Sequence, residues 1–161
     1  MISILSKRLL GRLSSFSWTQ PTLTSNGTMG GNSMAVSYDN GGGELLNTQA
    51  WQAFSPNNEL LGVYRDEAKT WLKIYIYTPH PVRARTLSFF NNSTSRSSSA
   101  FYNTKFYGGN SKGAETTLLL NIGTVGEGAT YTGSINTSIE YQYFEMYFEN
   151  GGYAYEDRIQ I

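Results

Sequence analysis

Apolar and polar residues alternate along several short segments of this chain, and a period of two predicts β-strands. In segment 71–77, Leu72, Ile74 and Ile76 share one face, and aromatic and polar residues share the other. Segment 141–148 alternates in the same way. Each of these strands therefore has one apolar face suited to a core and one mixed face.

Shorter runs predict further strands, and glycine, asparagine and proline punctuate them. These strands are expected at 34–38, 82–90, 101–107, 116–122, around Tyr131, and up to 159–161. The TPHP run at 78–81 is expected to end the strand before it, and GGNSKG at 108–113 to form a tight turn. Many short strands with glycine-rich turns predict an all-β protein, an antiparallel β-sandwich or jelly roll.

Residues 1–16 differ from the rest, because their apolar positions recur every three or four residues, which predicts a short amphipathic helix. Lys7, Arg8 and Arg12 lie off the apolar line. The segment is too short and too charged to span a bilayer. Docking on its own domain or on a partner subunit is the favoured interpretation, and a basic helix on a membrane surface is the alternative. We therefore divide the chain into a docking segment, 1–16, and a β-domain, 17–161.

Composition excludes several classes of function. The chain has no cysteine, so it has no disulfide framework and no thiolate metal site. Its 12 Lys+Arg balance 12 Asp+Glu, so the charge pattern gives no basic footprint for nucleic acid. Charged residues make up only 15% of the chain, and 12 tyrosines are present. Such a composition is typical of loop-rich β-proteins.

The sequence argues against an enzyme. His80 is the one histidine, and it lies between two prolines, so no serine–histidine–carboxylate triad is indicated. The acidic pairs at 66–67 and 156–157 are neighbours in sequence, and neighbours on a strand point to opposite faces. No glycine-rich stretch is followed by the Gly-Lys-Ser/Thr of a phosphate-binding loop.

Six runs occur in an order that resembles the discoidin-like, galactose-binding-like jelly rolls, including modules of bacteriophage tail and virion proteins. They are AWQAF (50–54), TWLKIYI (70–76), P-x-x-V (79–82), FYGGNSKG (106–113), YQYFEMYF (141–148) and the closing IQI (159–161). The resemblance covers about residues 17–161. It implies a single galactose-binding-like jelly roll in which Trp51 and Trp71 support the core.

Departures from the family pattern limit what the resemblance implies. Ser55-Pro56 stands where the family has an Asp-Gly that helps to build a calcium site, so no cofactor is assigned. A calcium ion held by loop carbonyls and Asp39 or Asp66 stays open as an alternative. The histidine and two arginines of fucose-binding members are not carried over.

The resemblance places ligands at loops on one end of the sandwich. Sugars require aromatic rings beside planar polar groups on rigidly held loops. The candidate glycan-binding residues are Tyr38, Asn40, Asn57, Asn58, Tyr64, Arg65, Asp66 and Arg96.

The prediction is a non-enzymatic virion protein, a tail or decoration component that adheres to a host-surface polysaccharide. Residues 1–16 would attach it, in many copies, to other virion subunits. The alternative is a purely structural virion protein whose jelly roll packs against other subunits without binding glycan.

Overall fold

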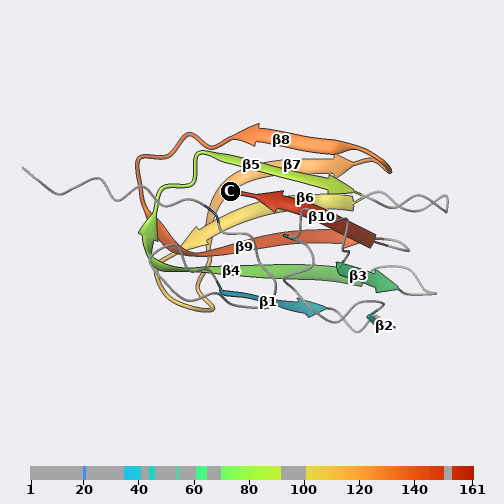
Figure 1. The fold of residues 1–161 in the computed structure, drawn as a ribbon, viewed down its shortest axis with the longest axis horizontal. Coiled ribbons are helices and arrows are strands. Elements are labelled where there is room, and N and C mark those ends of the chain that lie inside the picture. Colours follow the sequence, from blue (N-terminus) through green and yellow to red (C-terminus); the bar gives the residue numbers. More distant parts are fainter. Residues whose placement is uncertain are drawn as a thin grey trace, which may run out of the picture.

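The computed structural model of the protein is a sandwich of two five-stranded antiparallel sheets (Figure 1). The structure describes residue 20 and residues 35–40, 44–45, 54, 61–64, 70–91, 101–150 and 154–161. The first sheet contains, in spatial order, β1 (Ala35–Asn40), β4 (Thr70–Val82), β9 (Tyr141–Asn150), β6 (Phe101–Gly109) and β7 (Thr117–Val125). The second contains β2 (Glu44–Leu45), β3 (Leu61–Tyr64), β10 (Ala154–Gln160), β5 (Thr86–Asn91) and β8 (Thr130–Ser134).

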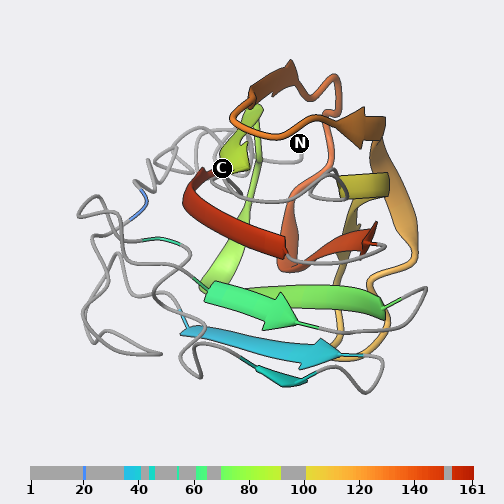
Figure 2. The same ribbon diagram turned by 90° about the vertical axis from the view of Figure 1, so that its right-hand side faces the viewer.

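The two sheets have matching edges. Strands β1 and β2 lie at one side of the molecule, and β7 and β8 lie at the other, in both views (Figures 1 and 2). The all-β antiparallel prediction is confirmed. Among the residues that the structure describes, no helix is long and apolar enough to cross a membrane. The predicted N-terminal helix, 1–16, lies outside the described residues.

The alternating pattern sets which face of each strand forms the core. Leu72, Ile74 and Ile76 of β4 are at most 2% exposed, as their period of two predicts. On β9, Phe144 and Phe148 are fully buried. The rings of Phe101 and Phe148 stack with centroids 4.5 Å apart, and packing of this kind joins β6 to β9.

The strand boundaries around TPHP were predicted wrongly, and the strand expected at 82–90 begins only at Thr86. The TPHP run does not end β4, which continues to Val82 with a register shift between Tyr77 and Val82. The hydroxyl of Thr78 donates to the carbonyl oxygens of His80 at 2.8 Å and Gln142 at 3.2 Å. A bulge of this kind accommodates prolines, which have no N–H for the ladder.

The far edge of the sandwich is fixed by Asn91, the last residue of β5. Its side-chain amide donates to the carbonyl oxygens of Val125 and Gly126, both at 3.1 Å. Its backbone N–H donates to the carbonyl of Ala129 at 3.0 Å. A fully buried asparagine thus holds the turn between β7 and β8 against the second sheet.

Candidate functional site

The outer face of the first sheet, opposite the core, carries a group of aromatic side chains. Side chains alternate between the two faces of a strand, so the same pattern that buries one face of β4 and β9 places their tyrosines on the outer face. We call the following six residues the aromatic face: Trp71, Tyr75, Tyr77, Tyr107, Tyr143 and Tyr147. Trp71, Tyr75 and Tyr77 belong to β4. Tyr143 and Tyr147 belong to β9, and Tyr107 belongs to β6. All six are partly exposed.

The strand register places Glu145 at the centre of the aromatic face. Glu145 of β9 pairs with Tyr75 of β4 on one side and with Tyr107 of β6 on the other. Tyr143 and Tyr147 are its neighbours two residues away along β9, so they lie on the same face. A carboxylate is therefore flanked by a tyrosine in each of four directions.

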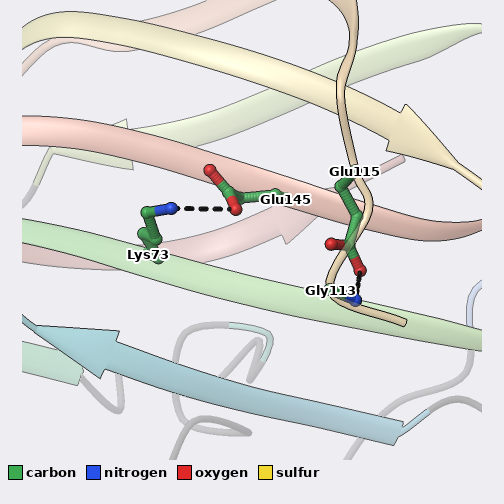
Figure 3. A network of polar contacts seen from close by, with 4 residues as sticks. All are labelled: Lys73, Gly113, Glu115 and Glu145. Atoms are coloured by element: carbon green, nitrogen blue, oxygen red, sulfur yellow. Dashed lines mark hydrogen bonds and ion pairs between the residues drawn. The ribbon is translucent and has the colours of Figure 1, made fainter. Parts of the chain in front are cut away.

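Glu145 forms an ion pair with Lys73 of β4. The Lys73 Nζ lies 3.2 Å from the Glu145 Oε2, as Figure 3 shows. It also lies 5.7 Å from the centroid of the Trp71 ring and 5.9 Å from that of Tyr147. The Glu145 side chain is 11% exposed and the Lys73 side chain 30%. The ammonium group is thus held by a carboxylate and two rings together.

The turn between β6 and β7 approaches the same surface. Lys112 of this turn places its Nζ 5.4 Å from the centroid of the Tyr77 ring. Glu115, 7% exposed, accepts a hydrogen bond from the backbone N–H of Gly113 at 3.3 Å (Figure 3). Gly113 has a φ of 81°, which glycine adopts without steric cost. A second carboxylate and a second cation therefore border the aromatic face.

Burial alters the ionisation of this surface. It raises the pKa of Tyr75 to about 12, and the charges of Glu145, Asp39 and Glu115 add to the increase. Burial and the nearby Glu149 carboxylate raise the pKa of Tyr147 to about 12. These two phenols therefore stay protonated at neutral pH. Tyr147 donates its proton to the Glu149 carboxylate at 2.8 Å, whereas Tyr75 can donate to a ligand.

The Glu145 carboxylate is shifted as well. Burial raises its pKa, and the charge and hydrogen bond of Lys73 oppose that increase. The face thus offers phenol and ammonium donors, a carboxylate acceptor and the apolar surfaces of six rings. A ligand with an apolar face and hydroxyl groups at its edges is complementary to this set.

The candidate residues proposed from the sequence are only partly described. Tyr38 and Asn40 lie in β1, where they pair with Ile74 and Leu72 of β4. Tyr64 is the last residue of β3, in the second sheet, and pairs with Glu44. These backbone positions belong to different sheets. The others, Asn57, Asn58, Arg65, Asp66 and Arg96, lie outside the described residues.

The alternative calcium site also involves an undescribed residue. Asp39 is exposed in β1, where it pairs in register with Lys73, and Asp66 lies outside the described residues. Within the described ranges, no three histidine, cysteine, aspartate or glutamate side chains are grouped to hold a metal ion.

The expected role of Trp71 is corrected by the structure. Trp71 does not support the core, because it lies on the face of β4 opposite Leu72, Ile74 and Ile76 and remains partly exposed. Trp51 lies outside the described residues. The sequence signal for the aromatic face was the run of tyrosines on the polar side of each alternating strand.

Comparison with known proteins identifies the fold. No family model matches the chain, and no curated protein matches it. A carbohydrate-binding module, CpGH89CBM32-6 from Clostridium perfringens, aligns with a TM-score of 0.54 at 12% identity, over 78% of this chain and 91% of that one.

Two further structures show that proteins of different function share the fold. A family 32 carbohydrate-binding module of C. perfringens NanJ, solved with galactose, aligns with a TM-score of 0.51 at 13% identity, over 76% of this chain and 93% of that one. Allantoicase aligns with a TM-score of 0.51 at 10% identity, over 75% of this chain and 40% of its own. The chain therefore has the galactose-binding-like β-sandwich fold that its sequence predicted.

Proposed function

We propose that the protein is a non-enzymatic carbohydrate-binding protein and that its aromatic face holds a saccharide. The observation that carries the proposal is Glu145, an acceptor carboxylate set among four partly exposed tyrosines on the outer face of the first sheet. The apolar side of a sugar ring packs on aromatic surfaces, and its hydroxyls need polar partners at the ring edge. The fold likeness to modules that bind carbohydrate supports the same function by analogy.

We also propose that the protein serves in a virion, as a tail or decoration component that adheres to a polysaccharide of the host surface. Its support is the sequence resemblance to modules of bacteriophage virion proteins. Residues 1–16 would dock it on other subunits in many copies. The end-loop candidates from the sequence, among them Tyr64 and Arg65, would form an alternative contact site for the glycan.

A purely structural role in the virion is the second candidate. Tyrosine-rich surfaces also form protein interfaces, because a tyrosine supplies a large contact area at a low cost in conformational entropy. Leu118, 49% exposed, pairs in register with Tyr107 and extends this surface toward the β7 edge. In that role the aromatic face would pack against a neighbouring subunit.

The first test is a glycan array probed with the full chain and with two variants. Wild type is expected to give saturable binding to a defined set of glycans, and Tyr75→Ala to weaken it at least tenfold. Thr130→Ala, an exposed position on β8 of the second sheet, is the matched control and should bind as wild type. If the folded protein shows no saturable binding to any glycan on the array, the structural role is favoured.

A separate test addresses the attachment segment. Particles assembled with a chain that lacks residues 1–16 are expected to lose the protein during purification, whereas the full chain stays bound. Normal incorporation of the shortened chain would show that attachment does not depend on this segment.

A further inference from the structure

We infer that the aromatic face selects an uncharged, hydroxyl-rich saccharide, with the Glu145 carboxylate as the central hydrogen-bond acceptor. This inference rests on the proposed carbohydrate binding and adds the chemical class of the ligand and the role of one residue.

The ion pair of Glu145 leaves one of its two carboxylate oxygens for a ligand. Its Oε2 contacts Lys73, whereas its Oε1 has no hydrogen-bond partner within the described part of the chain. The residue is only 8% exposed. An accessible carboxylate oxygen is a strong hydrogen-bond acceptor, so a hydroxyl donor that reaches Oε1 from the ligand is favoured. An ionised carboxylate accepts only, and each hydroxyl of a saccharide can donate to it.

Cations of the protein itself already lie against the rings. Lys73 lies near Trp71 and Tyr147, and Lys112 lies over Tyr77. An ammonium group of an amino sugar would meet these two positive charges at the same rings. A cationic ligand therefore gains little here from cation–π contact.

An anionic ligand would meet carboxylates of the protein on the same face. The Glu145 carboxylate lies between Tyr75 and Tyr107, and the Glu115 carboxylate borders the face at the β6–β7 turn. A uronic acid or a sulfated sugar would be repelled from this position. With both signs of charge disfavoured, a neutral saccharide remains.

The ring contacts fit such a ligand. Tyr75 and Tyr77 stand with ring planes within 5° of each other and centroids 6.4 Å apart. Tyr143 meets the Tyr77 ring edge-on at 5.4 Å. A pyranose packed against the tyrosines beside Glu145 would direct the hydroxyls at its edge toward the carboxylate.

The test compares neutral, amino and acidic glycans on one array, at about 0.05 M and about 0.5 M NaCl. We expect the bound glycans to be neutral and their affinity to change less than twofold between these salt concentrations, because little ion pairing is screened. Glu145→Gln, which keeps the shape of the side chain, is expected to lower that affinity about tenfold, since hydrogen bonds to a charged acceptor are about twice as strong as neutral ones.

Several outcomes overturn the inference. Binding confined to amino or acidic glycans, with affinity that falls steeply with salt, would refute the ligand class and leave carbohydrate binding intact. Unchanged affinity of Glu145→Gln for a neutral glycan, with Tyr75→Ala still weakened, would refute the role of Glu145 alone. Binding of no glycan by a folded protein would overturn carbohydrate binding and this inference together.

Discussion

Glu145 links the aromatic face to the pH dependence of folding. Burial raises its pKa above the ordinary 4.5, so the folded protein holds this proton more tightly than the unfolded chain does. The resulting stabilisation is fully present below the ordinary pKa and is lost as the pH rises through the folded-state pKa. We therefore expect the free energy of unfolding of wild type, relative to that of Glu145→Gln, to fall as the pH rises from 4.5.

Urea unfolding of both proteins across this pH range measures the difference. Only residue 145 differs, so the other carboxylates cancel. A difference that increases with pH would mean that Lys73, and not burial, dominates the pKa of Glu145.

At the same scale, Tyr75 and Tyr147 provide an optical signal. Both have a pKa raised to about 12. The unfolded chain releases these protons near pH 10, so folding stability should fall between pH 10 and 12.

An absorbance titration of the folded protein is expected to show a late step near pH 12 that becomes smaller in Tyr75→Phe. Ionisation of all tyrosines near pH 10 would contradict the assigned burial.

The β6–β7 hairpin is the element that positions Glu115 and Lys112 at the aromatic face. A Cβ added to Gly109, at the end of β6, would lie 2.4 Å from the backbone oxygen of Ala114. Because backbone atoms cannot move aside cheaply, Gly109→Ala should lower the free energy of unfolding by about 1–3 kcal/mol.

Gly126→Ala is the matched control, since nothing lies within 4 Å of the added Cβ there. The free energy of unfolding of Gly126→Ala, measured by chemical denaturation, should lie within about 1 kcal/mol of the wild-type value. Equal effects of the two substitutions would indicate that the turn does not pack against β6.

Strand β9 has one face in the core and one in the aromatic face, so its two faces should respond differently to substitution. Phe148 stacks on Phe101, and Phe148→Ala is expected to cost about 3–5 kcal/mol in unfolding free energy. Tyr147→Phe removes one hydrogen bond to Glu149, of 2.8 Å, and should cost about 1 kcal/mol. A similar loss in both variants, measured by thermal unfolding, would contradict the assignment of the faces.

Among the strands, the faces could be predicted from the sequence, whereas their pairing could not. Period-two alternation predicted β4 and β9 and the correct face of each, because that signal is local. The pairing of β4 with β9 joins residues about seventy positions apart, and no local pattern encodes it. The contact of Lys73 with Glu145 depends on that register, so the sequence identified each residue's face but could not group them into a site. TPHP was misread because a bulge at Thr78 lets the strand continue past its prolines.

For the whole molecule, the strands, glycine turns and apolar faces predicted an antiparallel β-sandwich, and the family resemblance implied the galactose-binding-like fold that is observed. The sequence emphasised the end loops, and the described structure adds a sheet face with its own donors, acceptor and rings. These two locations lead to different predictions for where a glycan makes contact.

The most direct test is to map contacts by NMR, with backbone amide shifts of the full chain recorded as a glycan that binds on the array is added. We expect the perturbed amides to cluster at 71–77, 105–107 and 143–147, with the second-sheet strand 130–134 unchanged. Shifts confined to the second sheet, or to residues 56–66 and 91–99 alone, would contradict the assignment of the binding site to the aromatic face.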